Sequence, residues 1–306
     1  MNVLIRRHGA GLLAGLKSVS SPCPRHVVTN LTASDTPTLG SPTEDLRVKL
    51  DFPPFVKELF ISQFNKSVLS YAEVINYERY HVLNEQTRQL ADFFQSEKSK
   101  IAAINERGVV PEEILVKLKS LDLPGLLVPS QFGGAELMHT EALRLYQELG
   151  SSLAISELFR QNELLCTRAI VEFGSDEQKL RYLDPISKGD LWTAFCQTEQ
   201  AAGSDPNSIR ARTKYDPDSH SYHLTGTKTW VSNAIRANLF LVFAKTQTRN
   251  YLGELEDAVS AFLVDGDTPG VQVSQPYDLA ALNGLQVCDV NFNCHIPASA
   301  LLGSNS

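Results

Sequence analysis

Two short stretches carry the residue types that are best suited to bind a ligand. Residues 195–205 read Phe-Cys-Gln-Thr-Glu-Gln-Ala-Ala-Gly-Ser-Asp and pass from an apolar run into a loop of small residues. Such a loop lets the backbone approach a ligand closely, and its amide groups can face an anion. Residues 226–233 place the indole of Trp230 just before the Ser232 hydroxyl and the Asn233 amide. An aromatic ring beside short polar side chains suits a flat ligand with polar edges, such as a flavin or a nucleobase.

From the residues alone, a core role for Trp230 stays open, because a tryptophan on a strand commonly packs inside. The order and spacing of the two stretches are more specific. They resemble the middle-domain signature of the acyl-CoA dehydrogenases, roughly [FY]-C-x-T-E-P-x-x-G-S-D followed by G-x-K-x-W-I-[ST]-N. The resemblance extends over residues 55–303. It is strongest toward the very-long-chain and complex I assembly branch of that family, through residues 56–60, 118–121 and 243–246.

The resemblance implies FAD as the cofactor and a fatty acyl-CoA as the substrate. In that family the α-proton of the acyl-CoA is removed while a hydride leaves the β-carbon for flavin N5. By similarity, the residues that line the cofactor are Phe195, Cys196, Gln197, Thr198, Gly203, Ser204, Trp230, Val231 and Ser232. Thr198 would bond the polar edge of the ring, Trp230 would pack on the isoalloxazine, and Ser232 would bond near N5. Ser204 would also approach the acyl-CoA substrate.

Three departures from the family pattern bear on activity. Gln200 stands in place of a loop proline, and residues 283–287 read Asn-Gly-Leu-Gln-Val where relatives carry Arg-Gly-Ser-x-Thr. The family's catalytic base is a glutamate of a C-terminal helical domain, which we expect to be missing here. General-base catalysis contributes roughly 10²–10⁴-fold in rate. We therefore predict no catalytic residue in this chain, a structural role for Glu199, and weak or absent FAD binding.

Three functions remain open. The first is an FAD-dependent acyl-CoA dehydrogenase of fatty acid β-oxidation whose full chain is longer, with a homodimer expected for that full-length form. The second is a non-catalytic scaffold that binds assembly proteins of respiratory complex I, which the changed residues 283–287 favour. The third is an inactive truncated isoform. The acyl chain-length preference stays undetermined.

Composition narrows the class of partner. The 306 residues carry a formal net charge of −7, which argues against a nucleic-acid partner because no basic face offsets it. No apolar run approaches the roughly 20 residues that a membrane-spanning helix needs. The chain has five cysteines, and none shows the C-x-x-C spacing of a metal site or a disulfide framework. His220 and His223 are close in sequence, but no cysteine or carboxylate completes a site, so we predict no metal.

The N-terminus has the composition of a targeting segment. It contains serines, small apolar residues and no acidic residue before Asp35. Its lysine and arginine residues are Arg6, Arg7, Lys17 and Arg25. We interpret residues 1–34 as a mitochondrial transit peptide and residues 35–51 as a Ser/Thr/Pro-rich linker. A disordered basic tail is the alternative. The interpretation places the protein in mitochondria, in the matrix or at the inner membrane.

The spacing of hydrophobic residues along the chain predicts an α+β protein. Residues 52–190 show helical spacing and form an all-helical N-terminal domain, with helices expected near 71–98, 111–121, 140–149, 153–173 and 175–183. From residue 191 to 303 the spacing changes to that of short strands, expected at 192–198, 222–224, 227–232, 239–245, 259–264, 271–273 and 287–292. Turn signals between them, including Thr225-Gly226, indicate a small antiparallel β-sandwich or barrel. Residues 304–306 form a tail.

Overall fold

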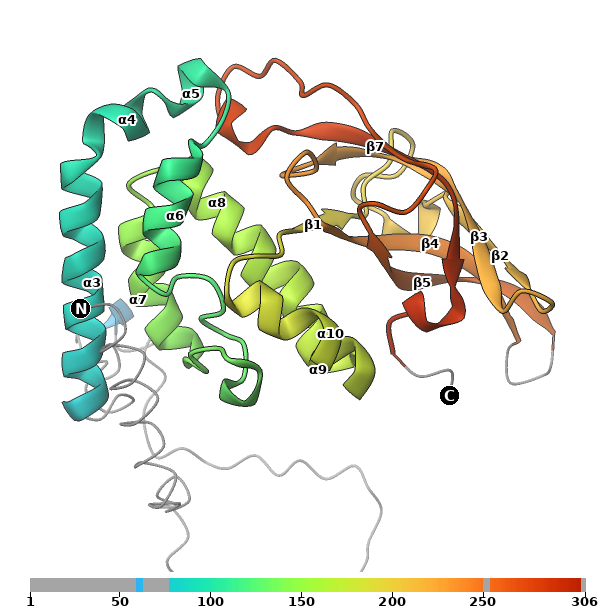
Figure 1. Ribbon diagram of the computed structural model, residues 1–306, viewed down its shortest axis with the longest axis horizontal. Helices are drawn as coiled ribbons and strands as arrows, with labels where there is room; N and C mark the ends of the chain where they lie inside the picture. Colours follow the sequence, from blue (N-terminus) through green and yellow to red (C-terminus); the bar gives the residue numbers. More distant parts are fainter. Residues whose placement is uncertain (1–58, 63–76, 250–253, 304–306) are drawn as a thin grey trace, which may run out of the picture. The chain divides into compact units, whose positions relative to one another are not determined.

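The computed structural model describes residues 59–62, 77–249 and 254–303 (Figure 1). The predicted transit peptide and linker lie outside the described residues. Glu78–Ser306 form one compact unit in which helices come first and strands follow. The predicted α+β class, a helical domain followed by a β domain, is confirmed. No described helix is both long enough and apolar enough to cross a bilayer.

The helices follow the apolar spacing of the sequence. They are α3 (Tyr77–Ser96), α4 (Lys98–Ala102), α5 (Ile104–Arg107), α6 (Glu112–Ser120), α7 (His139–Leu149), α8 (Leu153–Arg160), α9 (Arg168–Phe173) and α10 (Asp176–Ser187). The predicted capping box that opens α10 is confirmed, because the Gln178 amide donates to Ser175 Oγ and the Ser175 amide donates to the Gln178 side chain. On α6, Leu115 and Leu118 are buried as their spacing requires.

Helices α8 and α9 are joined by a π-helical segment, Gln161–Thr167. This segment carries two buried polar side chains that fix neighbouring parts of the chain. Asn162 Oδ1 accepts hydrogen bonds from the Thr193 amide at 3.0 Å and from the Thr193 hydroxyl at 2.9 Å. The bonds tie the start of the first strand to the helical part. π-Helical turns inside helices are rare and frequently occur at functional sites.

Glu163, the next residue of the π-helical segment, is a fully buried carboxylate. It accepts hydrogen bonds from the backbone amides of Gly125 and Leu127, and so holds the loop after α6. Burial raises the pKa of Glu163 to about 7, although the two amide bonds oppose the shift. Within the described residues, the Tyr146 hydroxyl is the one buried side-chain polar atom without a hydrogen-bond partner. Burial, together with the nearby Glu163 charge, raises the pKa of Tyr146.

Seven strands of the described residues form one curved sheet (Figure 1). They are β1 (Thr193–Cys196), β2 (Arg212–Asp216), β3 (Ser221–Val231), β4 (Leu239–Arg249), β5 (Leu255–Asp265), β6 (Val271–Val273) and β7 (Cys288–Pro297). The order is β1-β4-β2-β3-β7-β6, with β5 paired to the other side of β4. The sheet is mixed rather than purely antiparallel, since β4 runs parallel to both β1 and β2. Strand β4 returns beside β1 after two chain reversals, one between β2 and β3 and one between β3 and β4.

Two local predictions for the strands differ from the structure. The turn predicted at Thr225-Gly226 is wrong, because β3 continues through both residues. Gly226 has φ +148°, and a Cβ there would lie 2.5 Å from Cβ of Ala211, so the glycine permits close packing rather than a chain reversal. Strand β2 escaped prediction because its sequence, Arg-Thr-Lys-Tyr-Asp, is mostly polar and only Thr213 is buried.

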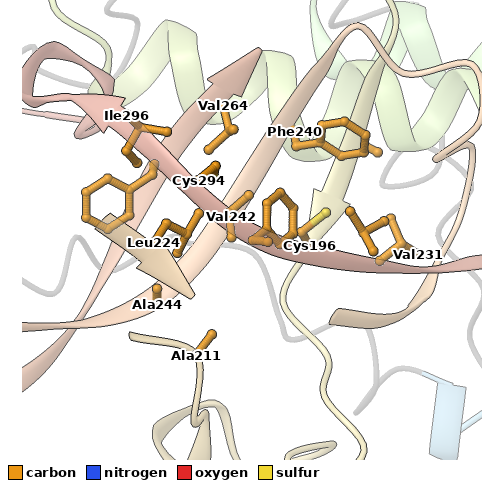
Figure 2. Close-up of a cluster of buried hydrophobic side chains, with 14 of the residues drawn as sticks. Cys196, Ala211, Leu224, Val231, Phe240, Val242, Ala244, Val264, Cys294 and Ile296 are labelled. Carbon is orange, nitrogen blue, oxygen red and sulfur yellow. The ribbon is translucent and has the colours of Figure 1, made fainter. Parts of the chain in front are cut away.

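The inner face of the sheet forms a hydrophobic cluster, part of which is drawn in Figure 2. It is built from side chains of β1, β3, β4, β5 and β7, among them Leu224, Phe240 and Val242. Cys196 and Val231 belong to this cluster (Figure 2). Both predicted binding stretches therefore begin on strands whose side chains are anchored in the core.

The buried Glu163 predicts a specific dependence of stability on pH. The folded carboxyl keeps its proton up to about pH 7, whereas the unfolded one loses it near its ordinary value of 4.5. Folding therefore takes up a proton between these values. The free energy of unfolding should fall by roughly 3 kcal/mol as the pH rises through this window, and should stay level above it.

Urea unfolding at several pH values, compared between the wild type and Glu163→Gln, measures this effect. The difference between the two curves should change with pH by that amount, because every other titrating group contributes equally to both proteins. Glu177→Gln, at an exposed position on α10, is the matched control and should give a level difference. A level difference for Glu163→Gln as well would contradict the prediction.

Candidate functional site

A buried ion pair joins the two predicted binding stretches. Lys228 Nζ lies 2.7 Å from Glu199 Oε1, and the side chains are 0% and 7% exposed, respectively. The same ammonium group donates to the Gln197 carbonyl oxygen at 3.0 Å. One residue of β3 therefore fixes both the beginning and the turn of the small-residue loop that follows β1.

Glu199 in turn organises the rest of this loop. Its carboxylate accepts hydrogen bonds from the amides of Arg210 at 2.7 Å and Ala211 at 2.9 Å. Its backbone closes a turn with Ala202 through two bonds of 3.0 Å. Burial acts to raise the pKa of Glu199, but Lys228 and the two amides outweigh it and hold the pKa below the usual range. Burial lowers the pKa of Lys228, and the Glu199 charge works against that shift. Glu199 thus has a structural role.

The two stretches also meet through their backbones. The Thr229 amide donates to the Thr198 carbonyl oxygen at 2.9 Å, just beyond the end of β1. Strand β3 ends two residues later, at Val231. The loop after β1 and the end of β3 therefore lie side by side, as a joint binding role requires.

Trp230 lies outside the core. The pairing of β3 with β7 shifts register between Lys228 and Val231, and Trp230 within the shift has φ +59°. Such an irregularity turns a side chain away from the regular alternation of the strand. Lys228 and Val231 are buried, whereas Trp230 is 59% exposed. The core interpretation of Trp230 is wrong, because the bulge directs the indole outward.

Backbone strain concentrates around the end of β3. Of the eight non-glycine residues with positive φ in the described part of the chain, four belong to two neighbouring segments: Trp230, Asn233, Leu282 and Gln286. The Asn233 amide donates to the Leu285 carbonyl oxygen at 2.8 Å, and its side chain donates to the Thr193 carbonyl oxygen at 3.1 Å. Unfavourable backbone conformations persist where surrounding contacts enforce them, and they cluster at functional sites.

Sequence reasoning missed Tyr277 and Asp289. The ring of Tyr277 contacts the Trp230 indole, with the ring centroids 4.9 Å apart and the planes at 60°. The Tyr277 hydroxyl donates to Asp289 Oδ1 and lies 3.1 Å from Thr229 Oγ1. Neither residue belongs to a recognisable motif, and the long irregular segment between β6 and β7 hides their proximity to Trp230 in the sequence.

The side chains of three predicted binding residues are largely inaccessible to a ligand. Cys196 and Val231 are fully buried in the core, so only their backbone could contact a bound molecule. Phe195 is partly buried and packs on Phe243, with the ring centroids 5.1 Å apart. Their side chains anchor the site rather than line it.

The remaining predicted residues are accessible. Gly203 and Ser204 are exposed in the loop, and a Cβ added to Gly203 would meet no atom within 4 Å. Thr198 and Ser232 are half-buried on either side of the joined stretches. The carbonyl oxygen of Gln197 is already bound by Lys228. An open glycine loop, two hydroxyls and an exposed indole fit a flat cofactor that carries phosphates.

The described residues contain no cluster of three or more His, Cys, Asp or Glu side chains that could hold an ion. The His220 ring lies 3.1 Å from the Tyr215 hydroxyl, whereas His223 stacks on His295. The two histidines singled out by their spacing therefore have separate partners.

Comparison with known proteins assigns the family. Residues 83–190 match the sequence model described as "Acyl-CoA dehydrogenase, N-terminal domain", and residues 194–294 match "Acyl-CoA dehydrogenase, middle domain". The two models follow one another along the chain without overlap. The chain belongs to the acyl-CoA dehydrogenase family. The family resemblance predicted from the two short stretches is confirmed.

Curated relatives of this acyl-CoA dehydrogenase family member include mitochondrial very long-chain specific acyl-CoA dehydrogenases. The Macaca fascicularis protein is 32% identical over 83% of this chain and 39% of its own length. The human protein is 30% identical over 89% of this chain and 42% of its own length. The chain thus spans about 40% of the length of these relatives.

Solved structures share the fold of this family member. An acyl-CoA dehydrogenase from Bacillus anthracis, complexed with FAD, matches with a TM-score of 0.66 at 24% identity, over 76% of this chain and 38% of the other. A glutaryl-CoA dehydrogenase from Mycobacterium smegmatis, in complex with FADH2, matches with a TM-score of 0.67 at 23% identity, over 77% and 58%. Members with this fold are therefore seen with a bound flavin.

The buried ion pair predicts a large loss of stability when one partner is removed. Lys228→Met keeps the length of the side chain but leaves the buried Glu199 carboxylate without its cation. The free energy of unfolding should fall by about 3–5 kcal/mol. Urea or thermal unfolding measures the change. Arg88→Met, which breaks an exposed ion pair on α3, is the control and should alter stability little.

The double variant Lys228→Met/Glu199→Gln separates loss of the charge partner from loss of packing. It should recover part of the stability lost in Lys228→Met, because no uncompensated charge remains buried. If Lys228→Met were as stable as the wild type, the pair would not organise the loop.

Proposed function

We propose that this chain forms the flavin-binding part of a mitochondrial acyl-CoA dehydrogenase-like flavoprotein that acts on fatty acyl-CoA. The observation that carries the proposal is the outward-turned Trp230, held beside the small-residue loop of residues 197–205. This arrangement occurs within the region that matches the middle domain of the family. The activity and substrate are part of the proposal, because the chain spans about 40% of the length of its curated relatives.

In the proposed site each accessible group has a task. Trp230 offers an aromatic surface on which the isoalloxazine packs, while Thr198 and Ser232 supply hydrogen bonds to the ring's polar edge. The exposed backbone at Gly203 and Ser204 faces the phosphates, and the Ser204 hydroxyl approaches the acyl-CoA. FAD, when bound, supplies the hydride acceptor for α,β-dehydrogenation.

The described residues near this site leave the role of general base unfilled. Glu199 is engaged by Lys228 and two backbone amides, and Asp289 accepts the Tyr277 hydroxyl. A carboxylate whose lone pairs are committed in this way is poorly placed to take a substrate proton. We therefore propose that the proton acceptor lies outside the described residues. We also propose that FAD binds this chain weakly, because the chain spans about 40% of the length of its curated relatives.

A second candidate is a scaffold without dehydrogenase activity, which would contact assembly proteins of respiratory complex I. The changed segment 283–287 favours it, because Asn-Gly-Leu-Gln-Val lacks the guanidinium and the two hydroxyls of the family pattern Arg-Gly-Ser-x-Thr. The segment packs on the helical part. A Cβ at Gly284 would lie 2.4 Å from the Ile104 side chain and 3.1 Å from that of Ala154. Asn283 is bonded in both directions to the Leu279 backbone. Homodimerisation and these protein partners belong to the proposal for the longer protein.

Removal of the indole tests the flavin site. Trp230→Ala should weaken FAD binding by about 1–3 kcal/mol, because the packing surface of an aromatic anchor is lost. Equilibrium dialysis of the full 306-residue chain against FAD, followed by absorbance, measures the affinity. Phe173→Ala removes a similarly exposed ring from α9 and should leave FAD affinity unchanged.

If the wild type binds FAD and Trp230→Ala binds it equally well, the assignment of this site is rejected. If the wild type takes up no FAD even at millimolar concentration, the scaffold function becomes the better interpretation. Co-purification with complex I assembly proteins from mitochondria then tests that function.

The proposed localisation has an independent test. Residues 1–34, fused to a fluorescent protein, should direct it into mitochondria and be removed on import, because the segment is basic and lacks acids. Arg6→Glu/Arg7→Glu is the control and should abolish import by reversing the local charge. A fusion that stays outside mitochondria with Met1 retained would contradict the proposal.

A further inference from the structure

Trp230 needs a contact that fixes its ring. Its backbone lies in a register shift with φ +59°, and more than half of its side chain is exposed. An exposed side chain without fixed neighbours exchanges among rotamers, and ordering it on ligand binding costs free energy. The Tyr277 ring supplies the aromatic contact, with an edge-type geometry that suits aromatic pairs.

Tyr277 is itself held at both ends. Its amide donates to the Val287 carbonyl oxygen at 2.8 Å, which fixes its backbone beside the start of β7. At the other end its hydroxyl donates to Asp289 Oδ1 and accepts from Thr229 Oγ1 at 3.1 Å. Asp289 is secured in turn, because its amide donates to Ser274 Oγ and its carbonyl oxygen accepts from the Ser274 amide, each at 2.9 Å.

The hydrogen-bond chain returns to the residue beside Trp230. Thr229, which contacts the Tyr277 hydroxyl, directly precedes Trp230, and its amide is the one bonded to the Thr198 carbonyl. The bond to Asp289 raises the pKa of Tyr277, while the Thr229 bond opposes that shift, so the phenol stays a neutral donor at physiological pH. The contact covers only part of the indole and leaves the rest open to a ligand.

We propose that Tyr277, held by Asp289 and Thr229, is a positioning residue that fixes the angle of the Trp230 indole for a flat aromatic ligand. The identification of this ligand as the flavin rests on the proposed function. Tyr277 acts through Trp230 and is not assigned a contact with the flavin. Tyr277 orders the Trp230 indole before the ligand binds. The free-energy cost of ordering this side chain on binding is therefore smaller, and the affinity is higher.

The test uses the full chain and begins without any ligand. The protein has two tryptophans, and the near-ultraviolet circular dichroism of each protein is compared with that of the same protein carrying Trp230→Phe, so that the difference isolates the Trp230 signal. Tyr277→Phe keeps the ring but loses both hydroxyl bonds, and Asp289→Ala removes the acceptor. Both variants should lower the Trp230 signal at least twofold. Asp289→Asn keeps an acceptor oxygen and should restore the signal.

The second measurement is the FAD affinity of the same variants. Tyr277→Phe and Asp289→Ala should weaken binding roughly 3- to 10-fold, as expected for one or two lost hydrogen bonds. Asp289→Asn should bind like the wild type. Tyr215→Phe is the matched control, because it removes from β2 an exposed phenol that bonds His220, and it should change neither measurement.

The outcomes separate the inference from the proposed function. An unchanged Trp230 signal in both Tyr277→Phe and a Tyr277→Ala variant that remains folded by far-ultraviolet circular dichroism would overturn the positioning role. A changed signal in a protein whose FAD affinity is insensitive to Trp230→Ala would support the positioning role and overturn the flavin site. Loss of thermal stability with an unchanged Trp230 signal would show a merely structural role and also overturn the inference.

Discussion

The pairing of Lys228 with Glu199 is the interaction on which the site depends. Two charges removed from water cost more than their attraction returns unless further hydrogen bonds complete them. Here the Gln197 carbonyl and the amides of Arg210 and Ala211 provide that completion. The pair therefore does more than neutralise charge. It fixes the path of a loop whose small residues have few side-chain contacts of their own.

The buried contacts hold the loop after β1 and the end of β3 rigidly, and this rigidity lets other groups of the same segments be exposed to solvent. The buried ion pair of Lys228 and Glu199 holds the loop. Asn233, which bonds both Leu285 and Thr193, holds the end of β3. The accessible groups can then face outward without collapsing onto the protein. Trp230 keeps an unfavourable backbone conformation because Lys228 and Val231, which precede and follow it in the chain, are buried. Burial of the apolar core, which contains Cys196 and Val231, offsets the free-energy cost of this conformation.

The sequence predicted the parts of this structure that depend on local pattern. Apolar spacing located the helices, and the Ser175 capping box marked the start of α10 because both of its bonds are local. The polar strand β2 and the parallel pairing of β4 depend on neighbours distant in the chain, so no local period reveals them. The two predicted binding stretches were recognisable by their residue types and spacing. Tyr277 was not, because its role arises only where the irregular segment after β6 meets the end of β3.

The π-helical segment has a consequence for how this chain can change in length. A π-turn contains one residue more than an α-turn, and each residue of an α-helix advances the chain by about 100°. Deleting one residue from Gln161–Thr167 would favour a regular α-helix. It would also rotate α9 relative to α8 about the helix axis. Asn162 and Glu163, which hold Thr193 and the loop at Gly125, could not then both keep their partners. Natural insertions and deletions should therefore be rarer within this segment than in the loops that connect the helices.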